Sequence, residues 1–254
     1  MTLNFENVGI PIAIIKKEGK KNTPVIFLDE KSEARHNLLE IITKDGETIQ
    51  PIPNPAKERS CIFVAGQSGS GKSYWTFLYV SEWKRLFPKR EVYLFSSLTS
   101  DTGSIDKIKN IKKIKVNEDL LNDDLTAEDF KDSLVIFDDT DCLTNKKIKL
   151  KVNGILNNIL ETGRHHNVYC IYTSHQCCKG AETKTILNEC SSVVLFPSTV
   201  GGKTLKYLLD SYFGLDKKQI LKLKHLKSRW VVINRTYPLT ILSEKEAYVL
   251  KVED

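Results

Sequence analysis

The stretch from Cys61 to Ser73 constrains this chain more than any other. It begins with an apolar run and continues into the pattern G-x-x-x-x-G-K-S, which is that of a phosphate-binding P-loop. The glycines of such a loop let backbone N–H groups approach phosphate oxygens, and the N-terminus of the following helix favours the anion. The residues that the pattern assigns to phosphate binding are Gly66, Gln67, Ser68, Gly69, Ser70, Gly71, Lys72 and Ser73.

The flanking sequence favours a P-loop over a chance glycine-rich turn. Residues 62–65 are a short apolar run, as expected of a buried parallel strand, and residues 74–87 lack glycine and proline and predict a helix. In a P-loop the lysine reaches the β- and γ-phosphates and the next hydroxyl binds Mg²⁺, so these roles fall on Lys72 and Ser73. The sequence therefore predicts ATP and Mg²⁺ as cofactors.

A second apolar run ends in two carboxylates. Residues 134–137 are apolar and are followed by Asp138 and Asp139, as in a Walker B strand. The pattern predicts that Asp138 orients Mg²⁺ at the end of a strand beside the P-loop strand, and that Asp139 polarises the attacking water. The alternative is an ordinary apolar strand that ends in an Asp-Asp turn. The P-loop upstream favours the functional interpretation.

A third predicted strand, residues 168–173, has a candidate residue at each end. Gln176 follows its carboxyl end, where a polar residue next to a P-loop strand faces the γ-phosphate, so Gln176 is a candidate sensor. Arg164 follows a predicted helix over residues 152–162 and lies at the opposite end, too far to reach its own nucleotide. It could act on a neighbouring subunit as an arginine finger. The alternatives are a loop amide for Gln176 and a helix-terminal cation for Arg164.

Charge points to an acidic partner. The 254-residue chain has a formal net charge of +6, and residues 198–235 contain nine Lys or Arg and two acidic residues. A local basic surface of this kind suggests nucleic acid, and the alternative is a solvated, lysine-rich helix face. Polar residues 140–151 carry Lys146, Lys147, Lys149 and Lys151, which we expect in a pore-side loop.

The cysteines predict neither a disulfide framework nor a metal centre. Six cysteines occur without any C-x-x-C pair, so a zinc ribbon is not expected and a reducing compartment is the simplest interpretation. The spacing of the cysteines and histidines at positions 165–178 has no standard metal-binding form. From the sequence we expect neither a signal peptide nor a membrane-spanning segment.

Composition along the chain suggests two regions. Residues 1–56 are predicted to form a small β-rich appendage that ends in a linker with three prolines, at positions 51, 53 and 55. This appendage could pack on the P-loop domain or could instead be an assembly arm that reaches a neighbouring subunit. Residues 57–254 are predicted to form the P-loop domain, with further strands over residues 91–95 and 192–196. The lysine-rich residues 105–116 are predicted to form an edge strand, and the alternative is a nucleic-acid contact. The domain is expected to end in a basic helix over residues 217–226 and a hairpin across Tyr237-Pro238.

Four motifs together resemble those of one family. The segments Gly66–Ser73, Ile136–Asp139, Gly163–Asn167 and Thr173–Gln176 are similar to those of the poxvirus-type genome-packaging ATPases of nucleocytoplasmic large DNA viruses, within the FtsK–HerA superfamily. The resemblance covers residues 59–242. It implies an α/β additional-strand P-loop NTPase fold, with a mostly parallel central sheet flanked by helices and the Asp138 and Gln176 strands beside the P-loop strand.

The resemblance also implies a function. It implies a homo-oligomeric ring, a pentamer or hexamer, that hydrolyses ATP to move double-stranded DNA into a capsid, with Arg164 as the finger and capsid or portal proteins as partners. We expect such a protein in the virion and at the viral assembly site in the host cytoplasm. The chain departs from the common pattern at Asp139, where many additional-strand ATPases have Glu.

Three alternatives stay open at this point. A ring-shaped DNA helicase or translocase of another role would share every motif, and strand separation would distinguish it. A nucleotide kinase would need an arginine-rich lid over the phosphates, and the region after Asp139 is rich in lysine instead. A virion protein that binds nucleotide without hydrolysis is disfavoured by the intact Lys72, Ser73, Asp138 and Asp139.

Overall fold

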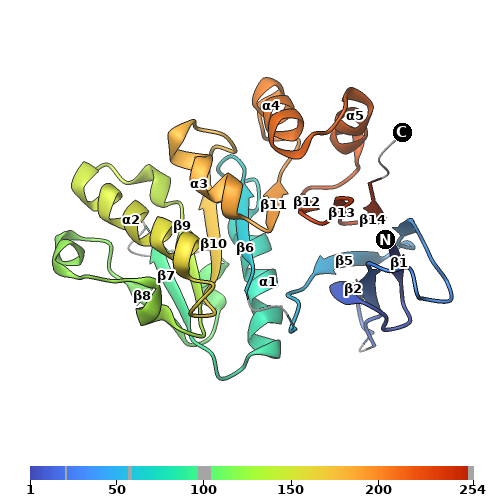
Figure 1. Ribbon diagram of the computed structural model, residues 1–254, viewed down its shortest axis with the longest axis horizontal. Helices are drawn as coiled ribbons and strands as arrows, with labels where there is room; N and C mark the ends of the chain where they lie inside the picture. Colours follow the sequence, from blue (N-terminus) through green and yellow to red (C-terminus); the bar gives the residue numbers. More distant parts are fainter. Residues whose placement is uncertain (21, 57–58, 97–103, 251–254) are drawn as a thin grey trace.

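A large sheet runs through the middle of the molecule (Figure 1). The computed structural model describes residues 1–20, 22–56, 59–96 and 104–250, and within these residues the large sheet has ten strands. Their order is β4-β14-β13-β12-β11-β6-β10-β9-β7-β8. The strands that surround the P-loop are β6 (Cys61–Ala65), β7 (Val92–Ser96), β8 (Ile111–Ile114), β9 (Leu134–Asp138), β10 (Tyr169–Ser174) and β11 (Ser192–Leu195).

The six strands from β11 to β8 are all parallel to one another. Parallel neighbours require crossover connections, and α1 (Lys72–Leu86), α2 (Lys146–Thr162) and α3 (Ala181–Glu189) lie in these connections. Helices on both faces bury such strands completely, and every residue of β6 and β9 is buried. The predicted fold class, a mostly parallel central sheet flanked by helices, is confirmed.

The order of the central strands corrects one prediction. The β10 strand pairs with β6 through Ile171 and Ile62, and with β9 through Ile171 and Ile136, so it lies between them. The strand that leads to Gln176 is therefore beside the P-loop strand, as predicted, whereas the Asp138 strand is one position further away. Apolar runs of equal length look alike in sequence, and only the crossovers and helix packing determine which run is central.

The lysine-rich segment before residue 152 is helical and is not a loop. Helix α2 begins at Lys146 because the Asn145 side chain caps it, accepting hydrogen bonds from the backbone N–H groups of Lys147 and Ile148. Ile148 continues the buried stripe of Val152, Ile155 and Ile159 at helical spacing. The prediction of a pore-side loop over residues 146–151 is therefore wrong.

The edge and the C-terminal elements follow the sequence closely. Strand β8 forms one edge of the sheet, although it is shorter than predicted and residues Ile105–Lys107 form a 3-10 turn, η1. Further 3-10 turns are η2 (Glu118–Asn122), η3 (Ala127–Phe130) and η4 (Thr140–Cys142). The predicted basic helix and hairpin are confirmed, and they are followed by a strand that we did not predict. These elements are α4 (Gly202–Phe213), α5 (Lys217–His225), β12 (Val231–Asn234), β13 (Thr240–Ser243) and β14 (Glu246–Val249).

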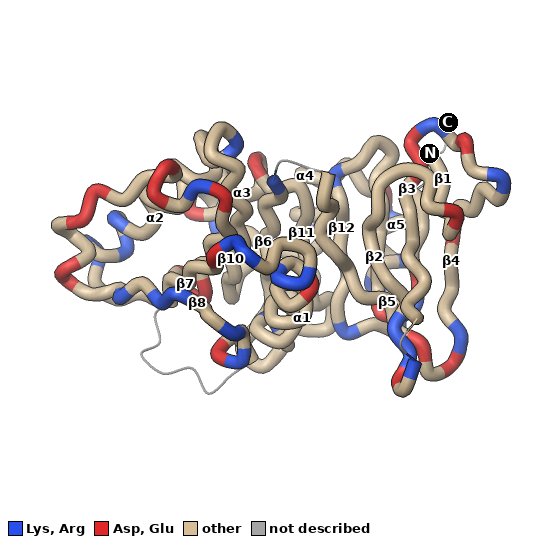
Figure 2. Tube along the Cα trace, turned by 90° about the horizontal axis from the view of Figure 1, so that it is seen from below, with Lys and Arg blue, Asp and Glu red and all other residues tan. Residues whose placement is uncertain are grey.

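The first 56 residues are β-rich, as expected. Four of their strands form a separate antiparallel sheet in the order β1-β3-β2-β5, namely β1 (Thr2–Asn4), β2 (Ile10–Lys17), β3 (Val25–Asp29) and β5 (Glu47–Pro51). Strand β4 (Glu40–Ile42) instead pairs with β14 and extends the large sheet. The four-stranded sheet lies at the β12 end of the molecule (Figures 1 and 2). The boundary at residue 56 stays a prediction, and residues 57 and 58 lie outside the described residues.

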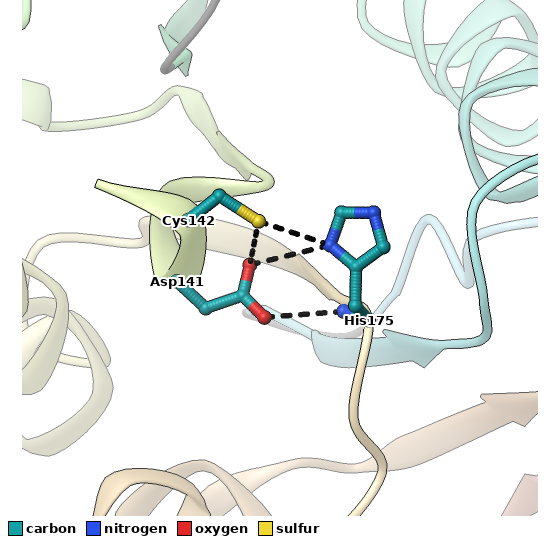
Figure 3. Close-up of side chains that lie close together, drawn as sticks. All are labelled: Asp141, Cys142 and His175. Carbon is teal, nitrogen blue, oxygen red and sulfur yellow. Dashed lines mark hydrogen bonds and ion pairs between the residues drawn. The ribbon is translucent and has the colours of Figure 1, made fainter. Parts of the chain in front are cut away.

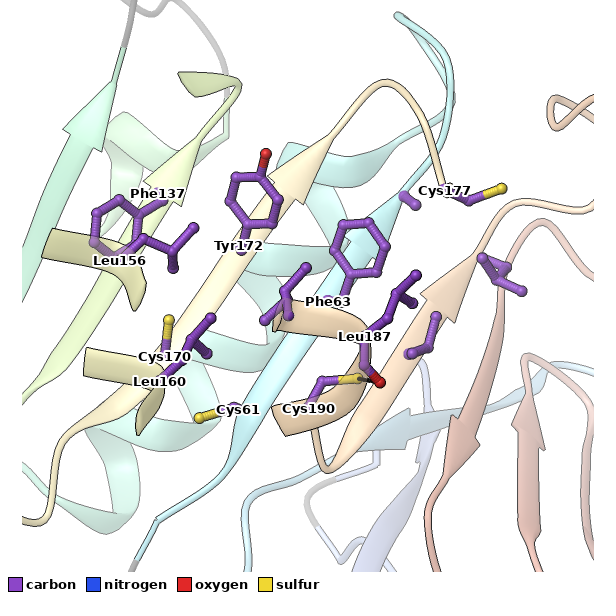
Figure 4. Close-up of a cluster of buried hydrophobic side chains, with 14 of the residues drawn as sticks. Cys61, Phe63, Phe137, Leu156, Leu160, Cys170, Tyr172, Cys177, Leu187 and Cys190 are labelled. Carbon is purple, nitrogen blue, oxygen red and sulfur yellow. Dashed lines mark hydrogen bonds between the residues drawn. The ribbon is translucent and has the colours of Figure 1, made fainter. Parts of the chain in front are cut away.

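Alternating residues of the central strands fill two cores. Cys61, Phe63 and Cys170 lie in the core that is completed by α2, α3, α4 and α5 (Figure 4). Ile62 and Ile171 face the other side, where Trp75 and Trp83 of α1 and residues of the N-terminal sheet pack. All six cysteines are free thiols, and burial raises the pKa of Cys170 well above its ordinary value. Cys61 and Cys170 are thus core residues.

An ion pair joins the N-terminal sheet to α1 and gives a first prediction. Lys16 Nζ lies 2.9 Å from Glu82 Oε1, and Arg85 Nε donates to Glu82 Oε2 at 2.8 Å. Burial alone would raise the pKa of Glu82, but these two cations lower it below its usual 4.5. Glu82→Gln should therefore reduce the free energy of unfolding at neutral pH by roughly 1–2 kcal/mol in urea titrations.

The pH dependence follows from the direction of that shift. A lowered pKa contributes stability above the unfolded value and loses it as the pH falls through the folded value. The difference between wild type and Glu82→Gln should therefore begin to shrink as the pH falls below 4.5, and it should vanish only once Glu82 is protonated in the folded protein. Glu91→Gln is the matched control, since its pair with Lys112 is exposed and should contribute less than about 0.5 kcal/mol. Equal effects of the two substitutions would contradict this assignment.

Candidate active site

The loop between β6 and α1 is a tight cradle of backbone. Gly69 and Gly71 have φ angles of 75° and 111°, which other residues rarely adopt. A Cβ atom on Gly66 would lie 2.7 Å from Ser70 Oγ and 2.8 Å from a ring carbon of Phe196. Helix α1 begins at Lys72, immediately after the cradle. The loop thus places backbone N–H groups and a helix N-terminus around one point, as an anion site requires.

The ammonium group of Lys72 is the charge at the centre of this site. Its side chain is only 5% exposed, and Nζ donates to Gly66 O at 3.0 Å and lies 3.4 Å from Asp139 Oδ1. A buried cation is tolerated only when it has such partners. The structure therefore brings together the first glycine of the loop, its lysine and the second of the two predicted carboxylates.

A threonine that we did not predict holds both carboxylates. Thr173 is fully buried in β10, and its Oγ1 lies 2.8 Å from Asp138 Oδ1 and 3.2 Å from Asp139 Oδ1. The same oxygen accepts a hydrogen bond from the backbone N–H of Asp139 at 3.0 Å. Asp139 itself has a φ angle of 49°, so the chain turns sharply after β9 and directs this side chain toward Lys72. Because β10 lies between β6 and β9, a residue at its carboxyl end, such as Thr173, lies between the P-loop and the two carboxylates.

The residues of the site fit a phosphate with a bound Mg²⁺ ion. Asp138 presents a buried carboxylate, and Ser73 presents a hydroxyl from the first turn of α1, both of which are oxygen ligands that Mg²⁺ prefers. Ser70 Oγ is buried inside the cradle and has no hydrogen-bond partner among the residues that the structure describes. Both the donor set and this unpaired hydroxyl fit the cofactors predicted from the motif.

Arg229 contributes a second cation that sequence analysis missed. It lies just before β12, and its Nε donates to Ser70 O at 3.0 Å while Nη2 lies 3.5 Å from Gly69 O. Its guanidinium group also lies 3.4 Å from where a Cβ of Gly71 would be. These contacts support the loop from outside and place positive charge beside it. No sequence signal links residues 159 positions apart.

Gln176 and Arg164 lie apart from the cradle. Gln176 is exposed after β10, and the residue there that approaches Asp139 is His175, with Nδ1 3.7 Å from Asp139 Oδ1. Arg164 is exposed in the turn after α2, at the amino end of β10. The strand alone separates that end from the site by roughly 16 Å, as expected for a residue that cannot reach its own P-loop. The roles of Gln176 as sensor and Arg164 as finger stay predictions.

The predicted basic stretch is only partly available as a surface. Of its nine cations, Arg229 supports the P-loop and the Arg235 guanidinium lies over the Phe213 ring. Lys222 Nζ pairs with Glu40 and lies over the ring of Tyr248. Elsewhere along the trace, Lys and Arg are scattered among Asp and Glu (Figure 2). A nucleic-acid contact would therefore depend on the other lysines of α4 and α5.

The strand order, the cradle and the paired carboxylates define the class of the chain: it has the additional-strand P-loop NTPase fold. No family model matches the chain. It is 40% identical over 253 residues to the uncharacterized protein V3 of the Sputnik virophage, and the match covers 98% of each protein. The chain therefore belongs to the same family as the virophage protein V3.

The first of two similar solved structures agrees with this fold. The cytoplasmic domain of the type VII secretion ATPase EccC from Thermomonospora curvata matches with a TM-score of 0.51 at 13% identity, over 88% of this chain and 30% of that chain. The genome packaging NTPase B204 from Sulfolobus turreted icosahedral virus 2 matches with a TM-score of 0.48 at 14% identity, over 78% of this chain and 100% of that chain. Among the described residues, none of the helices has the length and apolar character needed to cross a membrane.

The position of Thr173 gives a second prediction. Thr173→Val keeps the shape of the side chain but removes the donor to Asp138 and the acceptor for the Asp139 N–H group. Buried polar groups that lose partners cost about 1–3 kcal/mol, so urea unfolding should show a loss of this size. Thr173→Ser, which keeps the hydroxyl, is the control and should be clearly more stable than Thr173→Val. Retention of full stability by Thr173→Val would mean that this hydroxyl does not hold the carboxylates.

Proposed function

We propose that this chain is a Mg²⁺-dependent ATPase whose homo-oligomeric ring moves double-stranded DNA into a viral capsid. The observation that carries the hydrolytic part is the buried Lys72, held between the P-loop carbonyl of Gly66 and the carboxylate of Asp139. A phosphate in the loop would share this ammonium group with Asp139. Binding and activation of the γ-phosphate would then occur at one point.

Each residue of the site has a role in hydrolysis under this proposal. Lys72 and the loop N–H groups bind the phosphates, and Ser73 and Asp138 are the residues that would hold Mg²⁺. Bound Mg²⁺ supplies positive charge that offsets the charge on the phosphate oxygens. Asp139 accepts a proton from the attacking water, and Thr173 fixes the distance between the two carboxylates. Gln176 would report the state of the γ-phosphate to neighbouring loops.

Ring assembly would complete the site. Arg164 is exposed at the amino end of β10, whereas its own P-loop lies at the carboxyl ends of the strands. Arg164 could reach the P-loop of a neighbour in a pentamer or hexamer. Such a finger is worth ~10³–10⁵ in rate. An isolated subunit would then be almost inactive, and hydrolysis would depend on association.

DNA packaging is the finer part of the proposal. It is supported by the four motifs that resemble poxvirus-type packaging ATPases and by the family relationship to a virophage protein. DNA would be held mainly by its phosphates, without sequence preference and with steep salt dependence. Capsid or portal proteins would be the partners, and the protein would act at the viral assembly site in the host cytoplasm and in the virion.

The test is ATP hydrolysis measured against protein concentration, with and without linear double-stranded DNA. Specific activity should rise as subunits associate, and DNA should raise it further. Arg164→Ala should lose at least about 10³-fold and should inhibit wild-type protein when the two are mixed. His165→Ala, an exposed neighbour in the same turn, is the control and should stay active.

The outcomes separate the parts of the proposal. Activity that is independent of concentration and unaffected by Arg164→Ala would exclude the finger in trans. A rate of ATP hydrolysis that DNA does not change but an added nucleoside raises would contradict DNA packaging and indicate a kinase reaction. Strand separation by the ring would indicate a helicase instead.

A further inference from the structure

Three different metal-ligand side chains converge beside the candidate active site. Asp141 and Cys142 lie in η4, directly after the two carboxylates of β9, and His175 follows β10. One oxygen, one sulfur and one nitrogen atom from these residues all lie within 4.8 Å of one another (Figure 3). They come from two segments more than 30 positions apart, so the sheet rather than local sequence brings them together.

The distances among these atoms match those around one cation. Cys142 Sγ lies 3.2 Å from His175 Nδ1 and 3.7 Å from Asp141 Oδ1, and His175 Nδ1 lies 3.8 Å from Asp141 Oδ1. A point equidistant from the three atoms is about 2.1 Å from each. Zinc binds oxygen and nitrogen at about 2.0–2.2 Å and sulfur at about 2.3 Å, so the spacing of the three atoms is close to what one ion requires.

From this geometry we propose that Asp141, Cys142 and His175 bind a thiophilic divalent cation of the zinc class. The sulfur and imidazole ligands favour zinc or cobalt over Mg²⁺, which prefers oxygen. Cys142 is exposed, so a fourth position is open to water. Binding converts the Cys142 thiol to a thiolate, which releases one proton to solvent, and His175 binds through its neutral Nδ1.

The Asp141 side chain is oriented for this role before any cation binds. Its Oδ2 accepts hydrogen bonds from Ser174 Oγ at 2.8 Å and from the His175 backbone N–H at 3.2 Å, which leaves Oδ1 toward the cluster. Lys149 Nζ donates to the Asp141 carbonyl at 3.0 Å and ties η4 to α2. Partners of this kind fix the orientation of metal ligands and raise affinity.

The proposed site is separate from the Mg²⁺ position but touches the same machinery. Mg²⁺ is assigned to Asp138 and Ser73, neither of which belongs to the cluster. His175 Nδ1 also lies 3.7 Å from Asp139 Oδ1, so a cation at the cluster would take this nitrogen away from Asp139. The proposal does not depend on ATP hydrolysis, and its tests do not measure it.

The first experiment titrates Co²⁺ into the purified full chain and follows absorbance. We expect one ion per chain to produce a thiolate-to-cobalt charge-transfer band, which oxygen-bound Co²⁺ lacks. Cys142→Ser should abolish this band. His175→Ala removes a ligand and should weaken binding by at least about 100-fold, because the loss of a residue that only orients a ligand already costs about 10- to 100-fold. Cys178→Ser, at a half-buried cysteine in the loop after His175, is the control and should keep the band.

The second experiment uses the unmodified chain and measures alkylation of Cys142 by mass spectrometry. Zn²⁺ should slow alkylation of Cys142, whereas Mg²⁺ should not, and the rate at Cys178 should stay unchanged with either ion. A charge-transfer band that survives Cys142→Ser, the absence of any band in wild type, or equal Zn²⁺ protection of Cys142 and Cys178 would each overturn the proposed site.

Discussion

The buried ammonium group of Lys72 is the constraint around which the rest of the site is arranged. A charge that is 5% exposed requires partners, and the chain supplies a carbonyl from the P-loop and a carboxylate from the strand two positions away. These contacts tie the loop after β6 to the turn after β9. The two segments that we propose bind phosphate and activate water are thus joined by one side chain.

The intervening strand makes this connection possible. Strand β10 separates β6 from β9, so Lys72 reaches across its carboxyl end, where Thr173 and His175 lie. The Thr173 hydroxyl is within hydrogen-bond distance of both aspartates, and His175 lies beside Asp139 and beside the thiol of Cys142. Partial burial and the nearby Asp141 and Asp139 raise the pKa of Cys142, which argues against a cysteine nucleophile at this position.

Sequence alone predicted the elements better than their arrangement. The P-loop, the Asp138 strand and the helix–helix–hairpin end of the chain follow from glycines, apolar runs and breakers such as Gly214 and Pro238, which act locally. The position of β10 was not predictable, since it depends on which crossover packs where. The helical start of α2 depended on the Asn145 cap, and Arg229 and the Asp141–Cys142–His175 cluster depend on contacts between distant segments. The roles of Arg164 and Gln176 concern neighbours and ligands outside a single chain.

Calorimetric titration of the chain with Mg²⁺ and ATPγS tests the central claim most directly, because it measures phosphate binding without requiring ring assembly or DNA. We predict one nucleotide per wild-type chain and binding that is about 10- to 100-fold weaker in Lys72→Ala, the cost of one charge-assisted contact. Lys89→Ala, an exposed lysine beyond the far end of the same helix, should bind as wild type does. Equal affinity in Lys72→Ala and wild type, with both proteins folded, would contradict the claim that this ammonium group is the centre of a nucleotide site.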